Sequence, residues 1–328
     1  MIATTVSVIV VNHQRADLLL DCLRSIAQAV KEVPGTTETI VVDNGSGDDS
    51  CDRVRREHPD VVLIELSENR GFATAVGAAA EKASGDWLLL LNNDATIEVN
   101  AIADLVAVGV SAPDIGSLAA QLRFAHRPPR LNSAGIEVDA LGVSYDRLLG
   151  LPLERSEASP TEVFGASGGA ALYRRAMLEQ IGGFDRSFFV FMEDADVAWR
   201  ARMAGWRCLY VPSAVVHHHH SATARHRSAF KHLHVGRNRV RLVAKNMDSR
   251  ALARRALGMI VYDLAYVTFH VAVDRTLAPL RGRLLGLRDW RHYRRIGAPT
   301  RRPIPLAPSR GLRAAARRRA SYLAGRNW

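Results

Sequence analysis

Two acidic clusters and a run of histidines carry the side chains best suited to chemistry. The first cluster is Asn92-Asn93-Asp94, which closes an apolar run, and the second is Glu193-Asp194-Ala195-Asp196. His217 to His220 follow a short way beyond the second cluster. A carboxylate at a strand end and a downstream imidazole can together bind a divalent metal. A second carboxylate that does not bind the metal could then act as a base.

Each of these groups also has an ordinary structural explanation. Asn92-Asn93-Asp94 could be a polar turn after a strand. The cluster at Glu193 could simply favour the start of a helix, where the helix dipole stabilises negative charge. However, three carboxylates in four residues repel one another more than a helix cap requires. We therefore expect Asp194 to accept a proton, whereas Asp196 is expected to hold the local structure through Arg200 at the i+4 position.

The histidine run is expected either to be a solvated loop or to supply a metal ligand. Neutral imidazole is a common ligand for Mn²⁺ and related metals. We expect one histidine of the run to bind the metal and the others to be neighbours or phosphate contacts.

Several further polar residues lie at expected strand ends or helix starts. Asp43 could bind a nucleobase or ribose, or could serve only as a turn residue. Arg70 precedes an expected helix, and a helix N-terminus suits phosphate. The sequence has no Walker-type phosphate loop and no Gly-x-Gly-x-x-Gly after its first strand, so ATP hydrolysis and hydride transfer have no support.

The elements that must position these residues alternate between strand and helix over the first hundred residues. Such repeated units predict a parallel sheet with helices on both faces, with ligands beyond the carboxyl ends of the strands. Asn12, Asp43 and Asn92 to Asp94 are all at such ends. The expected strands are Val6–Val11, Thr39–Val42, Val61–Leu66 and Asp86–Leu91, and the expected helices are Arg15–Val30, Asp49–His58 and Gly71–Ala83.

The second half of the chain is less regular. Glu193–Ala204 is predicted to be a helix, and Cys208–Val211 a short strand that Pro212 stops. Residues 221–328 are predicted to be mostly helical. Within them Leu257–Val273 is the one candidate for a membrane span, but it is short for that role. We expect it to lie in a membrane interface or to pack on the rest of the protein.

The charge of the chain is unevenly distributed. Residues 221–328 contain 25 Lys and Arg against 4 Asp and Glu, whereas residues 1–220 contain 19 against 29. A basic region of this kind favours a polyanionic partner, either nucleic acid or an anionic membrane surface. No leader sequence is evident, and the three cysteines have no metal-binding spacing, which favours a cytoplasmic protein with reduced thiols.

The combination of motifs resembles the family 2 glycosyltransferases of GT-A fold. The resemblance covers roughly residues 5–222, and its nearest branch is the rhamnosyltransferases of bacterial surface polysaccharide synthesis. It implies a GT-A catalytic domain over residues 1–222 and a basic helical region over residues 223–328, peripheral on the inner face of the plasma membrane. The matching segments are residues 6–12, 42–46, 69–72, 85–94, 168–170, 182–185, 193–200 and 205–206.

The resemblance also implies roles for individual residues. Asp94 and His218 would bind Mg²⁺ or Mn²⁺, with His217 and His219 as alternatives to His218. Asp194 would deprotonate the acceptor, and Glu193 beside it is also expected to be catalytic. The remaining implied contacts are Asn12, Asp43, Arg70, Asn92 and Asn93 for the donor nucleotide, and Gly168 and Gly169 for the acceptor. Asn92 departs from the family pattern, which has Asp at that position, and this predicts a weaker metal site.

The implied reaction is sugar transfer with inversion at the anomeric carbon. The expected donor is dTDP-L-rhamnose, with UDP-hexoses and UDP-galactofuranose as alternatives, and the expected acceptor is a glycan or a polyprenyl-linked saccharide. Two other classes remain open at this point. One is a nucleotidyltransferase that makes the sugar nucleotide, although no glycine-rich loop follows the first strand. The other is a non-enzymatic polyanion-binding protein, although no nucleic-acid recognition motif is present and nucleic acid is not an expected partner.

Overall fold

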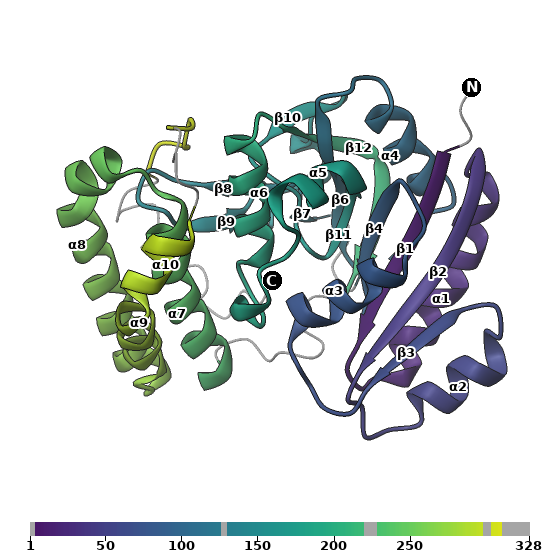
Figure 1. Cartoon of the computed structure of the whole chain (residues 1–328), viewed down its shortest axis with the longest axis horizontal. Coiled ribbons are helices and arrows are strands. Elements are labelled where there is room, and N and C mark those ends of the chain that lie inside the picture. Colours follow the sequence, from purple (N-terminus) through teal and green to yellow (C-terminus); the bar gives the residue numbers. More distant parts are fainter. Residues whose placement is uncertain (1–3, 126–129, 220–227, 298–302, 310–328) are drawn as a thin grey trace. The chain divides into compact units, whose positions relative to one another are not determined.

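The computed structural model describes residues 4–125, 130–219, 228–297 and 303–309 (Figure 1). The chain divides into two units. An N-terminal unit comprises Met1–Ile136 and Asp146–Arg225, and a C-terminal unit comprises Glu137–Tyr145 and His226–Trp328. The predicted domain boundary between residues 222 and 223 lies outside the described residues.

The first part of the N-terminal unit alternates strands with helices, as the sequence predicts. Each predicted strand and helix of this part is present, with ends shifted by a few residues. The elements are β1 (Thr4–Asn12), α1 (Ala16–Ala29), η1 (Val30–Glu32), β2 (Gly35–Asn44), α2 (Ser50–Glu57), β3 (Val62–Leu66), α3 (Phe72–Lys82) and β4 (Trp87–Asn92).

The chain from residue 95 to residue 218 adds short strands that the sequence does not reveal, because pieces of three residues carry too little periodicity. The elements are β5 (Ala95–Ile97), α4 (Ala101–Gly109), β6 (Ile115–Phe124), β7 (Leu131–Ser133), β8 (Ile136–Val138), β9 (Ser144–Asp146), η2 (Leu153–Arg155), β10 (Thr161–Val163), β11 (Ala170–Arg174), α5 (Arg175–Ile181), η3 (Arg186–Phe188), α6 (Glu193–Met203) and β12 (Arg207–His218).

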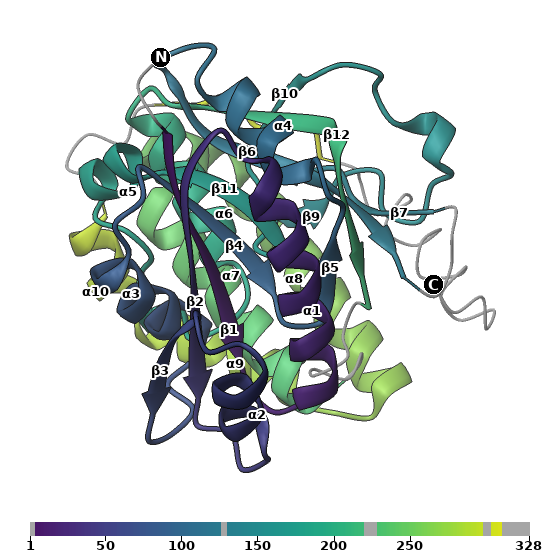
Figure 2. The same ribbon diagram turned by 90° about the vertical axis from the view of Figure 1, so that its right-hand side faces the viewer.

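One sheet organises the N-terminal unit, with strand order β10-β12-β6-β11-β4-β1-β2-β3 (Figures 1 and 2). β3, β2, β1 and β4 are mutually parallel, and β6 and β12 are parallel to each other. β11 runs antiparallel to both β4 and β6, which makes β6 parallel to β4. Six of the eight strands on this path therefore run in one direction, and the predicted mostly parallel α/β sheet is confirmed.

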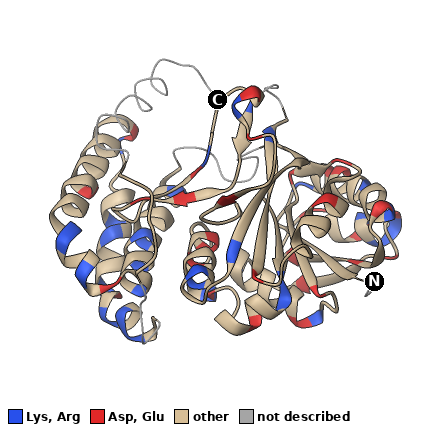
Figure 3. Ribbon diagram, turned by 90° about the horizontal axis from the view of Figure 1, so that it is seen from above, with Lys and Arg blue, Asp and Glu red and all other residues tan. Residues whose placement is uncertain are grey.

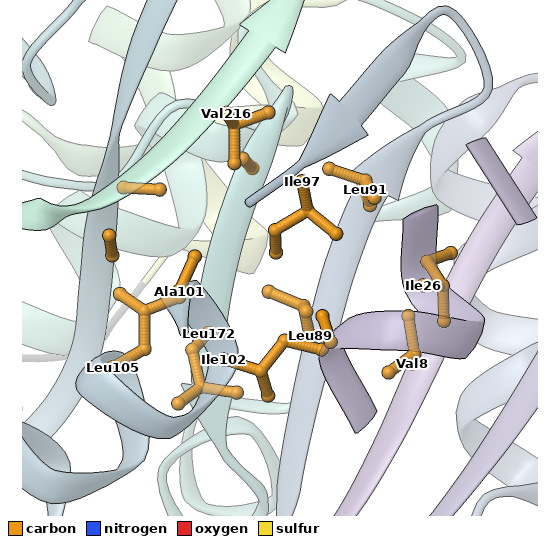
Figure 4. Close-up of a cluster of buried hydrophobic side chains, with 14 of the residues drawn as sticks. Val8, Ile26, Leu89, Leu91, Ile97, Ala101, Ile102, Leu105, Leu172 and Val216 are labelled. Carbon is orange, nitrogen blue, oxygen red and sulfur yellow. The ribbon is translucent and has the colours of Figure 1, made fainter. Parts of the chain in front are cut away.

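Helices cover both faces of the sheet because alternate strand residues supply two separate cores. Val8 and Leu89 face α1 and α4, where they pack with Ile26 and Ile102 (Figure 4). Their neighbours in the strands, such as Leu88, face α3, α5 and α6. Strands buried on both faces give the continuous apolar runs seen in the sequence.

Strand β12 corrects the prediction that Pro212 ends a short strand. The strand continues from Arg207 to His218. Its register against β6 shifts between Val211 and Val215, so Pro212 lies in an irregular stretch. Proline lacks an N–H to donate and is tolerated at a bulge. As a result, His217 and His218 lie in a strand rather than in a solvated loop.

Residues 229–296 of the C-terminal unit are mostly helical, as predicted, whereas its segment Glu137–Tyr145 contributes most of β8 and β9. Figure 3 shows its helices carrying many Lys and Arg. Glycines let α7 and α9 cross closely: a Cβ at Gly282 would lie 2.2 Å from the Leu233 carbonyl oxygen. The helices are α7 (Ala229–Asn246), α8 (Ser249–Asp274), α9 (Ala278–Arg288) and α10 (Trp290–Ile296).

Helix α8 differs from its neighbours in how little of it is buried. Only Ala251 and Met259 are buried among its 26 residues. Leu257 and Leu264 are 75% and 63% exposed, and Ile260 and Val261 lie on the same side of the helix between them. The helix is long and apolar enough to cross a membrane, which by itself is weak evidence for a span.

Candidate active site

Asp94 and His218 form a buried pair. Asp94 Oδ1 lies 3.0 Å from His218 Nε2, and both side chains are less than 10% exposed. The pairing follows from the sheet: β5 begins directly after Asp94 and pairs with the end of β12, where His218 lies opposite Ala95. The strand end and the downstream histidine that the sequence singled out therefore meet in space.

The hydrogen bond on the other ring nitrogen fixes the tautomer of His218. Nδ1 lies 2.8 Å from Asn132 Oδ1, which can only accept, so Nδ1 carries the proton. In the neutral ring Nε2 then presents a lone pair, which accepts from Asn92 Nδ2 at 3.3 Å. The same lone pair faces the carboxylate of Asp94. Two acceptors at this distance repel each other unless a cation, either a proton or a metal ion, lies between them.

The other histidines of the run differ from His218. Successive residues of a strand point to opposite faces, and His217 Nε2 lies 3.0 Å from Glu98 Oε1 on the surface. The backbone N–H of His219 donates to the Asp94 carbonyl. His220 lies outside the described residues. The geometry thus favours His218 over His217 as the partner of Asp94.

Gly168 and Gly169 connect this pair to the second acidic cluster. The backbone N–H of Gly168 donates to Asp194 Oδ2 at 3.1 Å. On its other side, a Cβ at Gly169 would lie 3.7 Å from both Asn92 Nδ2 and His218 Cε1. A side chain at Gly168 would therefore lie against Asp194, and one at Gly169 against Asn92 and His218.

The two adjacent carboxyl groups at the start of α6 differ in the surroundings that shift their pKa. Desolvation, together with the charge of Asp194, raises the pKa of Glu193 to about 8. Burial also raises the pKa of Asp194, but backbone N–H donors from Gly168 and Ala195 oppose that effect. Glu193 Oε2 is buried without a hydrogen bond. Near neutral pH Glu193 is therefore protonated, whereas the backbone N–H donors favour the charged form of Asp194.

A second polar group lies at the carboxyl ends of β1 and β2. Asn12 is fully buried and donates to Asp43 Oδ1 at 2.9 Å. Asn93 donates to Asn12 Oδ1 at 2.8 Å, and the backbone N–H of Ser46 donates to Asp43 Oδ2. This chain of bonds fixes Asp43 relative to the loop that carries Asp94.

Arg70 lies beside this polar group through its backbone. Its N–H donates to Asn44 Oδ1 at 2.8 Å, and its side chain is exposed just before α3. The structure thus places Arg70 near Asp43 in the fold, but it gives the guanidinium no described phosphate-like partner.

Two further observations concern residues around the site. Arg200 bonds Asp196 and the carbonyls of Ile181 and Gly183, as expected for an Asp196 that holds local structure. Asn132 was not predicted, because it lies in the irregular middle of the chain and no motif surrounds it.

The chain is similar to known proteins of one family. A model of the family described as glycosyl transferase family 2 matches residues 7–182. The chain belongs to this family. The matched segment includes Asp43, Asp94 and the Gly168–Gly169 pair, whereas Asp194 and His218 lie beyond it.

The curated relatives of this family 2 member include two bacterial enzymes. It is 32% identical over 202 residues to an N-acetylglucosaminyl-diphospho-decaprenol L-rhamnosyltransferase of Mycobacterium tuberculosis, covering 55% of this chain and 66% of the relative. It is 24% identical to a poly-beta-1,6-N-acetyl-D-glucosamine synthase of Staphylococcus aureus, of which it covers 47%. The chain thus spans about two thirds or less of these relatives.

Solved structures of glycosyltransferases share the fold. GalNAc-T7 with UDP, GalNAc and Mn²⁺ superposes with a TM-score of 0.62 at 18% identity, covering 89% of this chain and 58% of that one. TarS residues 1–349 of S. aureus superposes with a TM-score of 0.57 at 16% identity, covering 88% and 80%. The predicted GT-A fold is confirmed.

Proposed function

We propose that this protein is an inverting glycosyltransferase that moves L-rhamnose from dTDP-L-rhamnose to a polyprenyl-diphosphate-linked saccharide. Family membership supports glycosyl transfer. The donor and acceptor classes rest on the mycobacterial relative, whose name specifies an L-rhamnosyltransferase acting on a decaprenol-linked substrate.

One observation carries the proposal: Gly168 and Gly169 lie between the buried Asp94–His218 pair and the carboxylate of Asp194, which accepts a backbone hydrogen bond from Gly168. This arrangement provides a place for a leaving diphosphate on one side and for an acceptor hydroxyl on the other. A nucleotidyltransferase has no need of a base on the acceptor side, and no observation favours that class.

The residues at Asp94 and His218 fit a divalent metal. Oxygen and imidazole nitrogen are suitable donors for Mn²⁺ or Mg²⁺. Adjacent ligands of an octahedral ion with bonds of 2.0–2.1 Å lie about 2.9 Å apart, and the two donor atoms here lie 3.0 Å apart. When bound, the ion would offset negative charge on the departing diphosphate. Asn92 donates to His218 and carries no charge, so we expect a weaker site than a pair of carboxylates would give.

Asp194 is the proposed base. Its carboxylate would accept the proton of the acceptor hydroxyl while that oxygen bonds to the anomeric carbon and the bond from this carbon to the nucleoside diphosphate breaks. A single displacement of this kind inverts the anomeric configuration. The Gly168 N–H holds Asp194 in place, and the protonated Glu193 avoids a second charge beside it.

We propose that Asp43 and Arg70 contact the donor nucleotide and that Asn12 and Asn93 act mainly by positioning. Asn12 is fully buried, and its amide is engaged by Asp43 and Asn93. The exposed Arg70 beside the start of α3 suits a phosphate.

A panel of nucleotide sugars tests the donor class. Purified protein with Mn²⁺ and a short-chain polyprenyl-diphosphate N-acetylglucosamine is offered dTDP-L-rhamnose, UDP-hexoses and UDP-galactofuranose, and the products are separated by chromatography. We expect transfer from dTDP-L-rhamnose with an inverted product anomer. Transfer from a UDP-sugar alone would overturn the donor assignment but not glycosyl transfer. No transfer from any sugar nucleotide, with tight binding to duplex DNA instead, would favour the polyanion-binding alternative.

We also propose that the C-terminal unit binds the inner face of the plasma membrane peripherally. The exposed side of α8 is apolar at Leu257, Ile260 and Leu264, and Arg254 and Arg255 lie on the same helix. Apolar burial combined with arginines near anionic headgroups is typical of interfacial helices. A lipid-linked acceptor would be reached from this position.

A further inference from the structure

The C-terminal unit contains a second group of possible metal ligands, separate from Asp94 and His218. His232 belongs to α7, and His270 and Asp274 belong to α8. One ligand atom from each of the three lies within 4.8 Å of the others. Neither the family match nor the sequence motifs include these residues.

The three side chains share one carboxylate. Asp274 Oδ2 lies 3.2 Å from His232 Nε2 and also hydrogen-bonds His270 Nδ1. His270 and Asp274 are four residues apart, which places them on one side of α8. The two imidazole rings lie 4.4 Å apart between centroids. Neighbouring ligands of a tetrahedral Zn²⁺ with bonds of 2.0–2.2 Å lie about 3.3 Å apart, close to the 3.2 Å between Asp274 and His232. The hydrogen bond between His270 and Asp274 is shorter than this spacing, so the two side chains would move apart when they bind the ion.

The side chains of the group are largely shielded from solvent, and His232 Nε2 makes no hydrogen bond. The side chains of His232, His270 and Asp274 are 7%, 12% and 3% exposed. His232 Nε2 lies close to the carboxylate but lacks hydrogen-bond geometry with it. A buried polar atom without a hydrogen-bond partner destabilises the fold. A shared metal ion would satisfy this nitrogen and the carboxylate together.

The surrounding charges permit a cation. Two basic side chains, Lys231 and Arg283, lie near His232. The charge of Arg283 is directed to Asp263, which its Nε contacts at 2.8 Å.

A metal ion would also hold α8 against α7 in this unit. With only Ala251 and Met259 buried, α8 has little apolar contact to hold it, and its described links to α7 are polar, such as Arg239 to Asp263 at 2.9 Å. We propose that His232, His270 and Asp274 bind Zn²⁺ and thereby fasten α8 to α7. Two imidazoles and one carboxylate form a known zinc ligand set, with a fourth position left for water.

Metal titration of the full-length protein tests the proposal. The protein is stripped with a chelator and titrated with Zn²⁺, and with Co²⁺, which reports tetrahedral coordination by its visible absorption. The His270→Ala and Asp274→Asn variants are compared with His218→Ala, which removes the other site, and with His234→Ala. His234 lies on α7 two residues from His232, is buried, and is not in the group, so it is a matched control.

We expect His218→Ala and His234→Ala to keep a tight Zn²⁺ site and the Co²⁺ absorption. His270→Ala and Asp274→Asn should bind Zn²⁺ at this site at least about 100-fold more weakly, since loss of an outer-shell partner alone typically costs 10- to 100-fold. Zn²⁺ should slow amide hydrogen exchange in α8 of the His218→Ala protein. Equal binding by all four variants, or loss of the absorption in His218→Ala alone, would overturn the proposal. Circular dichroism of each variant separates loss of the site from loss of the fold.

Discussion

At the scale of single residues, Asn132 shows how a side chain away from any motif can tune the site. Its carbonyl oxygen accepts from His218 Nδ1 and so leaves Nε2 free of a proton. Replacing Asn132 with Ala should weaken Mn²⁺ binding by about 10- to 100-fold. Asn132→Asp keeps an acceptor and should retain binding near the wild-type level. Free Mn²⁺ measured by electron paramagnetic resonance gives both values, and equal binding by the Ala and Asp variants would contradict the role.

The raised pKa of Glu193 predicts that the stability of the fold depends on pH. Its pKa is about 8 in the folded protein, against an ordinary value of 4.5. Because the folded-state pKa is raised, the stability that the protonated group provides is complete below pH 4.5 and is lost as the pH rises toward 8. Urea unfolding should therefore show Glu193→Gln gaining stability relative to wild type across this window, with no further gain above it. A difference that does not depend on pH would contradict the burial argument.

At the scale of elements, the start of α6 depends on a buried ion pair. Asp196 is fully buried and contacts Arg200, which also caps the carbonyls that end α5. Asp196→Ala leaves a mostly buried guanidinium unpaired and should destabilise the fold by about 3–5 kcal/mol. Asp114→Ala breaks an exposed, solvent-screened pair with Arg207 and should reduce the free energy of unfolding far less. Chemical denaturation of the two variants checks this, and similar losses would refute it.

The elements also show where sequence reasoning succeeds and where it stops. Apolar runs and helical periodicity are local, so β1 to β4 and α1 to α3 could be predicted, along with polar residues at the strand ends. The path of β12 past Pro212 depends on a bulge against β6, which is a property of strand pairing. Asn132 and the group around His232 likewise depend on contacts between residues far apart in the chain.

At the scale of the whole molecule, the basic charge of the C-terminal unit predicts that the protein binds anionic membranes. The full-length protein should sediment with vesicles containing phosphatidylglycerol and not with phosphatidylcholine alone, and binding should weaken as salt is raised. A Leu257→Glu, Leu264→Glu variant should lose most of this binding but keep transfer to a water-soluble acceptor. Val110→Glu, at an exposed apolar residue of the N-terminal unit, is the matched control. Resistance to alkaline carbonate extraction from cells would instead indicate that α8 spans the membrane.

The most direct test of the account measures donor binding and sugar transfer by Asp194→Asn. With the carboxylate gone but its shape kept, the variant should bind dTDP-L-rhamnose with Mn²⁺ as tightly as wild type, and turnover should fall by roughly 10²- to 10⁴-fold. Wild-type turnover should rise with pH as Asp194, whose pKa burial raises, loses its proton. Turnover within a few-fold of wild type in Asp194→Asn would contradict the account.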